Sequence, residues 1–144
     1  MVEQDSVKLL RECDAGTKMG MSSIGDVLPY VKSEGLKALL RRSLREHELL
    51  SEELEGLLAR YRDEGKDPNV VAKGMSMIKT NVKLAMDTSD ATIADLMTDG
   101  CDMGIKSLAR YLNQYKAANE SAKAITRRLI AAEEALGRDL RGYL

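Results

Sequence analysis

The stretch that decides the fold is LMTDGCDMGIKSLARYLNQY, residues 96–115. Apolar side chains recur along it every three or four positions, which predicts an amphipathic helix. This apolar stripe is interrupted by Gly100, Cys101 and Gly104. Three other segments show the same periodicity, and each carries a polar residue inside its stripe near the height of Cys101. The pattern therefore predicts an all-α fold, a four-helix bundle with a polar layer across its middle.

The composition indicates one globular domain over residues 1–144. Its 44% hydrophobic and 31% charged residues are ordinary for a helical protein. The net charge is −1, from 22 basic and 23 acidic side chains, and this balance argues against nucleic acid or a membrane surface as a partner. The charged first ten residues do not resemble a secretion signal, and the two cysteines lie within helical patterns. We therefore expect a reduced, cytoplasmic location.

The first two helices are predicted to form an antiparallel hairpin. The expected ranges are 6–31 and 34–64, and the connection between them is very short. Ser33 is a plausible N-cap for the second helix. The expected stripe of the first helix is Val7, Leu10, Asp14, Thr17, Met21, Ile24, Leu28 and Val31. In the second helix the polar interruptions are Ser43 and His47.

The second half of the chain predicts another hairpin, with helices over 91–116 and 119–142. Glu133 lies beside the apolar stripe of the last helix. Between the two hairpins, Asp67-Pro68 is a strong helix start, and an apolar stripe follows to Met86. As a helix, residues 68–86 would be about 28 Å long, which is about the length of the bundle. We therefore predict a helical crossover that returns the chain to the end of the bundle where the first two helices are joined.

The polar interruptions are predicted to meet at one level. Counting residues from the shared turns, at 1.5 Å per residue, places most of them within about two helical turns of each other. The converging residues are Asp14, Thr17, His47, Cys101 and Glu133.

In this plan the chain resembles the ferritin-like superfamily, and most closely its small bacterial rubrerythrin-related and stress-protein-like members of unassigned function. Residues 36–58, LKALLRRSLREHELLSEELEGLL, look like the family's second helix, and residues 99–111, DGCDMGIKSLARY, look like its third. The resemblance implies two hairpins joined by a long crossover. Metal-binding members carry Glu on helices one and three and Glu-x-x-His on helices two and four, which together hold two iron or manganese ions.

This chain departs from that ligand pattern. Asp14 stands on helix one, and Cys101 stands where helix three would carry Glu. Leu44 precedes His47 by three residues, and Leu136 stands where the histidine after Glu133 should be. Too few carboxylates remain to neutralise and bridge two divalent ions. The resemblance therefore favours a ferritin-like bundle that has lost its di-iron site and binds no cofactor, and it favours an interaction or stress-related protein over an enzyme.

Several alternatives remain open from the residues. Asp14, His47, Cys101 and Glu133 could hold a single zinc, iron or manganese ion with a redox or storage role, or His47 could be a buried histidine bonded to Asp14, Thr17 or Ser43. Cys101 could be a redox thiol or a small buried apolar residue. The small side chains around it could line a ligand pocket. The methionine-rich stripe of residues 75–86 could bind a protein partner or pack on the bundle, and a homodimer is the default assembly.

Overall fold

The computed structural model describes residues 2–61 and 87–144. This part of the chain is entirely helical and contains no strand, which confirms the predicted all-α four-helix architecture. The four long helices are α1 (Val2–Val27), α2 (Glu34–Ala59), α5 (Asp90–Gln114) and α6 (Glu120–Leu140). Two short 3₁₀ helices, η1 (Leu28–Tyr30) and η2 (Arg141–Tyr143), follow α1 and α6. The predicted crossover helix over residues 68–86 lies outside the described residues.

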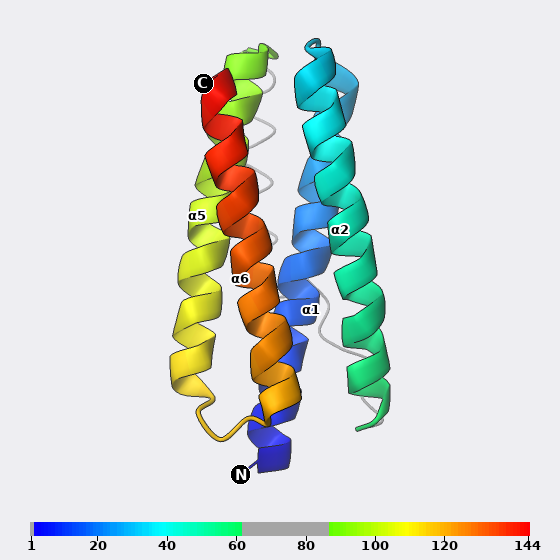
Figure 1. Cartoon of the computed structure of the whole chain (residues 1–144), viewed down its shortest axis with the longest axis vertical. Coiled ribbons are helices and arrows are strands. Elements are labelled where there is room, and N and C mark those ends of the chain that lie inside the picture. Colours follow the sequence, from blue (N-terminus) through cyan, green and yellow to red (C-terminus); the bar gives the residue numbers. More distant parts are fainter. Residues whose placement is uncertain (1, 62–86) are drawn as a thin grey trace.

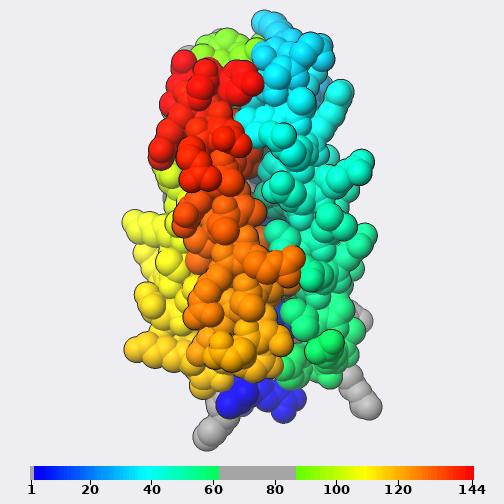
Figure 2. Space-filling view, viewed as in Figure 1, coloured from blue at the N-terminus to red at the C-terminus, as the bar shows by residue number. Residues whose placement is uncertain are grey.

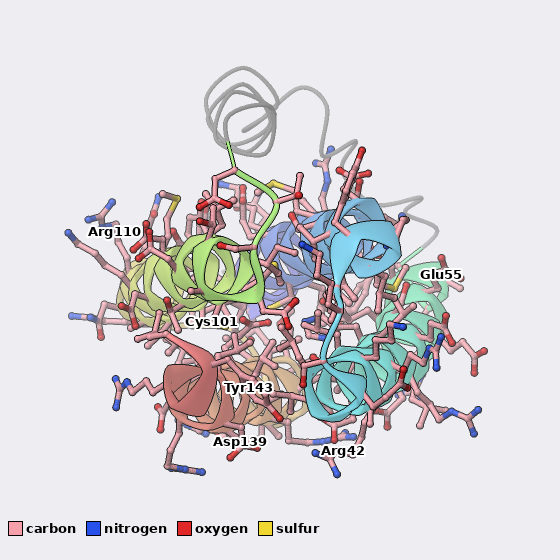
Figure 3. The ribbon with its side chains drawn as sticks, turned by 90° about the horizontal axis from the view of Figure 1, so that it is seen from above. Arg42, Glu55, Cys101, Arg110, Asp139 and Tyr143 are labelled. Atoms are coloured by element: carbon pink, nitrogen blue, oxygen red, sulfur yellow. The ribbon has the colours of Figure 1, made fainter. Side chains whose placement is uncertain are left out.

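The four helices stand side by side as two hairpins (Figure 1). α1 packs against α2 and α5 packs against α6, while α1 also contacts α5 and α2 also contacts α6. Seen from above, the helices occupy the corners of a square (Figure 3). α2 and α5 begin at the same end of the bundle, so these two helices run in parallel. No helix within the described ranges has the length and apolar character needed to cross a membrane.

Side-chain caps define where three of the helices begin. Ser33, Ser89 and Asn119 each accept a hydrogen bond from the backbone N–H three residues ahead. This arrangement satisfies one of the four N–H groups that a helix start leaves unpaired. The predicted Ser33 cap is therefore confirmed. α1 ends at Val27, earlier than predicted, and the chain continues as η1, which contains Pro29. Proline lacks the N–H that an α-helix needs at this point.

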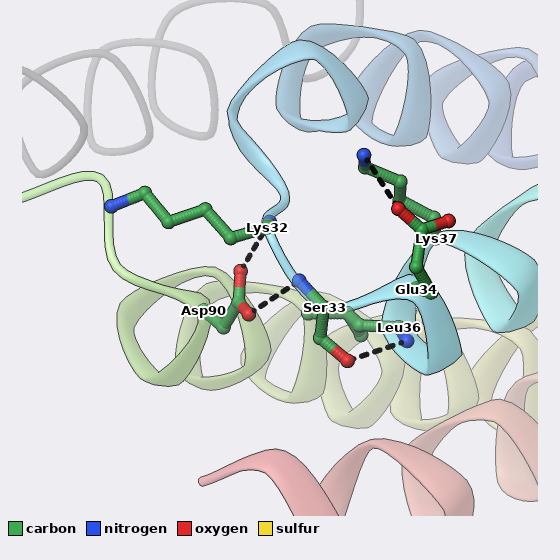
Figure 4. Close-up of polar contacts among 6 residues, drawn as sticks. All are labelled: Lys32, Ser33, Glu34, Leu36, Lys37 and Asp90. Carbon is green, nitrogen blue, oxygen red and sulfur yellow. Dashed lines mark hydrogen bonds and ion pairs between the residues drawn. The ribbon is translucent and has the colours of Figure 1, made fainter.

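A carboxylate joins the two hairpins at one end of the bundle (Figure 4). Asp90, the first residue of α5, accepts hydrogen bonds from the backbone N–H groups of Lys32 and Ser33, both at 2.9 Å. These N–H groups directly precede α2, so one carboxylate lies at two helix N-termini and complements the positive ends of both dipoles. At the opposite end, Asn119 donates from its backbone to Ser6 and from its side chain to Tyr61.

The core consists of two apolar clusters, one toward each end of the bundle. One cluster gathers around Ile24, Leu36, Leu40, Ile93 and Leu140, and the other around Leu9, Leu10, Leu54, Leu58 and Ile125. On α2, residue 47 lies between the two clusters. The apolar core is thus divided at the level of His47, where polar residues are buried.

The predicted stripe of α1 is wrong at three of its eight positions. Val7, Met21 and Leu28 are only partly buried, whereas Ser6, Cys13 and Val27 are fully buried. The predicted stripe and a second frame, which includes Ser6, Cys13 and Val27, both have a spacing of three and four residues. They share Leu10, Thr17, Ile24 and Val31, and all four of these residues are buried. Five of the eight residues of the predicted stripe are buried, compared with seven of the eight in the other frame, and the spacing alone does not separate the two because it is the same in both.

Candidate functional site

A buried histidine–glutamate pair lies where the two hairpins meet. His47 Nε2 is 2.7 Å from Glu133 Oε1, and this contact joins the middle of α2 to the middle of α6. The His47 side chain is 2% exposed and that of Glu133 is 15% exposed. His47 Nδ1 lies 2.8 Å from the backbone carbonyl oxygen of Ser43, one turn earlier on α2. Both ring nitrogens therefore have a partner inside the protein.

These two partners favour the charged form of the histidine. A carbonyl oxygen and a carboxylate only accept hydrogen bonds, so both bonds are made at once only when both ring nitrogens carry a proton. Burial of the ring by itself lowers the pKa of His47. The hydrogen bond and charge of Glu133, together with the Ser43 carbonyl, outweigh burial and raise the pKa above its usual value of 6.5. The partners of His47 thus favour its charged form in the folded protein.

Cys101 approaches the same carboxylate from α5. Burial, the negative charge of Glu133 and a hydrogen bond to Glu133 raise the pKa of the Cys101 thiol well above its usual value. The side chain lies between α5 and α6 (Figure 3), and it is 2% exposed. A thiol that stays protonated is a poor nucleophile and a poor metal ligand. Cys101 therefore lies near Glu133 as a buried, protonated thiol.

Three glycines, on α1, α5 and α6, lie beside these side chains, and only at Gly20 would an added Cβ be too close to its neighbours. A Cβ atom added to Gly20 of α1 would lie 2.9 Å from both Cδ2 and Nε2 of His47. A Cβ on Gly104 would lie 4.0 Å from Glu133, and one on Gly137 would lie 3.5 Å from Cβ of Cys101. The layer is therefore closely packed at Gly20, where the α1 backbone lies directly against the imidazole ring. All four helices contribute to it.

The structure brings His47, Cys101 and Glu133 together but places Asp14 elsewhere. Asp14 is completely buried, and its carboxylate pairs with Lys18 at 2.9 Å, one turn ahead on α1. Gly20, the α1 residue beside His47, is six residues from Asp14, or about 9 Å along the helix. Thr17 donates to the carbonyl of Cys13. Asp14 was expected at the height of His47 because the count from the turn assumed a rise of 1.5 Å per residue. Residues 28–33 are not α-helical and have a larger rise, so the count was wrong on α1.

A second buried polar contact lies between α1 and α6. Cys13 Sγ is 3.1 Å from Thr126 Oγ1, and Thr126 also donates to the carbonyl of Ala122. Burial raises the pKa of Cys13 to about 12, although the bond to Thr126 acts in the opposite direction. Sequence reasoning missed this contact. The available signal was Thr126, a polar residue next to the apolar stripe of the last helix.

The His47 side chain of the polar layer bonds to other groups of the protein, namely Glu133 and the Ser43 carbonyl. Within residues 2–61 and 87–144, no three His, Cys, Asp or Glu side chains form a group that could hold a metal ion. The predicted set of Asp14, His47, Cys101 and Glu133 is divided, because Asp14 pairs with Lys18. Whether the remaining three residues take up a metal ion stays a prediction.

Comparison of the chain with protein-family models, with curated proteins and with solved structures found no significant match. The functional argument therefore depends on the residues of this bundle alone.

Proposed function

We propose that the chain is a non-catalytic, cytoplasmic bundle of ferritin-like plan that acts by binding protein, as a homodimer, and has lost the di-iron site. The observation that carries the proposal is the closed bonding of His47. Its Nε2 and Nδ1 are both bonded within 2.8 Å, to Glu133 and to the Ser43 carbonyl. The only histidine of the chain thus has no ring nitrogen left for a substrate or a metal ion.

The surrounding groups support a structural role for the layer. Glu133 already accepts from His47, and the Cys101 thiol lies near the same carboxylate. The thiol of Cys101 is held protonated. A buried ion pair of this kind adds little net stability compared with apolar residues, but it strongly disfavours packings in which its partners are separated. We therefore assign the layer to alignment of the two hairpins, and we assign function to the outer surface.

Metal analysis and oxidation assays test this proposal. The chain is purified without chelator and without a metal-affinity resin, and metal content is measured by mass spectrometry. We expect far less than one metal ion per chain, and no peroxidase or ferroxidase activity with added iron(II). The variant carrying His47→Leu and Glu133→Leu should remain folded, because a buried ion pair is replaceable by apolar side chains. Stoichiometric iron or manganese together with either activity would refute the proposal.

A second candidate function is binding of a single metal ion by side chains from three helices that lie near one another. Because these side chains do not form a metal-binding group in the described residues, they would have to rearrange to hold the ion. His47, Cys101 and Glu133 offer nitrogen, sulfur and oxygen ligands of the types that suit zinc. An ion would have to displace the protons that now lie between these groups, so its binding should release protons and weaken at low pH. Titration with Zn²⁺ followed by calorimetry tests this function. Binding near one ion per chain that disappears in His47→Ala would support it, and no binding would exclude it.

A further inference from the structure

The outer side of α2 carries a regular stripe of exposed residues. The stripe consists of Ala38, Arg41, Arg45, Glu48, Glu52, Glu55 and Ala59, and all seven are exposed. Their spacing of 3, 4, 3, 4, 3, 4 is that of a helix seam that packs along a second helix. The inner seam of the same helix, which includes Leu36, His47 and Leu54, already faces the bundle. α2 runs along the surface beside α6 (Figure 2), and the side chains of Arg42 and Glu55 extend outward from it (Figure 3).

The charges of this stripe are segregated by sign. Its first half is basic, with Arg41 and Arg45, and its second half is acidic, with Glu48, Glu52 and Glu55. Within the described residues these side chains have no ion-pair partner. Arg41 and Arg45 are four residues apart, as are Glu48 and Glu52, and like charges at this spacing destabilise a helix. Within the stripe, only Arg45 and Glu48, at the junction of the two halves, are opposite charges at a favourable spacing.

An antiparallel copy of the same helix would pair four of these five charges and would leave Glu48 beside the two-fold axis, close to the Glu48 of the second copy. Arg45 and Glu52 are symmetric about the midpoint between residues 48 and 49, and Arg41 and Glu55 are symmetric about almost the same point. A two-fold axis at this point would place Arg45 opposite the Glu52 of a second copy, and Arg41 opposite its Glu55. Alanines would face each other toward the two ends, where small side chains permit close approach. The stripe would be about 32 Å long, from 21 residue steps at 1.5 Å.

An exposed leucine lies at the centre of this arrangement. Leu49 is 58% exposed, beside the proposed axis, and it is the largest apolar side chain on the outer side of α2. Its symmetry mate would lie next to it, which gives an apolar contact beside the two Glu48 side chains, with the charge pairs on either side. This combination of an apolar centre and a charged rim is typical of protein–protein interfaces.

We propose that the outer face of α2 is the homodimer interface of this protein, formed by antiparallel pairing of α2 with α2 of a second copy. The inference rests on the proposed function, since it names the partner of a bundle that acts through protein contacts. Because both copies use the same surface, the interface is closed and does not propagate into a fibre. α5 also has acidic residues followed by basic ones and could pair with itself in the same way. It is the weaker candidate because its Asp95 and Asp99 already interact with other groups.

Charge reversal tests the pairing. Sedimentation velocity up to about 1 mM protein should show a dimer. The Arg41→Glu, Arg45→Glu variant should raise the dissociation constant at least about tenfold, and so should the Glu52→Arg, Glu55→Arg variant. An equimolar mixture of the two variants should dimerise again. The variant with all four reversals should dimerise like the wild type, because antiparallel self-pairing restores every pair. Circular dichroism checks that each variant is folded.

The four-fold reversal separates this pairing from the main competing arrangement. If α2 packed instead on α5 of another copy, reversing all four charges of α2 would abolish association, and that result would overturn the proposal. A monomeric wild-type protein at every concentration would overturn it as well. That outcome would leave the proposed absence of metal and catalysis intact, because metal analysis tests the two ideas separately.

Cysteine crosslinking provides a matched control. Leu49→Cys should form a disulfide-linked dimer under mild oxidation, because the two copies of residue 49 lie beside the axis. Met103→Cys on α5 introduces an equally accessible thiol, since Met103 is 56% exposed, but it should remain monomeric under the same conditions. The native Cys13 and Cys101 are buried and do not compete. Crosslinking through residue 103 but not through residue 49 would refute the assignment to α2.

Discussion

Replacement of Gly20 by alanine gives the sharpest test of the packing in the polar layer. In the middle of a helix, Gly→Ala normally stabilises by up to about 1 kcal/mol. At Gly20 the added Cβ would lie 2.9 Å from two atoms of the His47 ring. The ring is held by Glu133 on one side and by the Ser43 carbonyl on the other, so it cannot move without loss of a bond. Overpacking of this kind costs about 1–3 kcal/mol.

We therefore expect Gly20→Ala to lower the free energy of unfolding by up to about 2 kcal/mol, after the gain in helix propensity is subtracted from the overpacking cost. Gly16, on the same helix, is the matched control because a Cβ there meets nothing within 4 Å. Gly16→Ala should stabilise by up to about 1 kcal/mol. Urea denaturation followed by circular dichroism at 222 nm measures both variants.

A double-mutant cycle then identifies the clash with His47. In a His47→Ala background the imidazole ring is absent, so Gly20→Ala should become stabilising, as Gly16→Ala is in the wild type. The coupling energy between the two positions should be about 1–3 kcal/mol. If Gly20→Ala stabilises the wild-type chain as much as Gly16→Ala does, the contact between α1 and the ring described here is wrong.

Two further predictions concern the charged contacts. The pKa of His47 is raised on folding, so its contribution to stability is complete below about pH 6.5 and is lost as the pH rises through the folded pKa. The urea midpoint should therefore fall between pH 6 and pH 9, and Glu133→Gln should flatten this dependence; an unchanged profile in that variant would contradict the pairing. Asp90→Ala should destabilise the bundle by about 1–2 kcal/mol, because two backbone N–H groups lose their acceptor. Thermal unfolding measures this loss, and a melting temperature equal to that of the wild type would show that water replaces the carboxylate.

Most of the architecture could be predicted because the apolar periodicity is strong. The predicted ranges 91–116 and 119–142 agree with α5 and α6 to within two residues at each end. The cap at Ser33 could be predicted directly, because the serine precedes a strong helical pattern. These features are local, and they depend little on how the helices are placed relative to one another.

The candidate site could be predicted only in part because it depends on relative height. His47, Cys101 and Glu133 meet because α2, α5 and α6 are regular over the relevant lengths, so counting residues gives correct heights. On α1 the count passes through η1 and an extended turn, where the rise per residue is larger. The count therefore selected Asp14, whereas the helix presents Gly20 to the layer. A glycine carries no polar signal, so the sequence pattern could not identify its role.

The division of the core by a polar layer explains why the glycines matter. Leucine-rich clusters on either side would pack in several registers, because one leucine replaces another at little cost. His47 and Glu133 fit at only one height, where Gly20 leaves space for the ring and the carboxylate lies across from it. A shift of one turn would bury both charges without partners, which costs several kcal/mol. We therefore expect the His47→Leu, Glu133→Leu variant to remain stable but to lose its unique packing, seen as broadened methyl resonances in NMR spectra. Sharp, wild-type-like spectra would show that the glycines and the end contacts at Asp90 are sufficient to set the register.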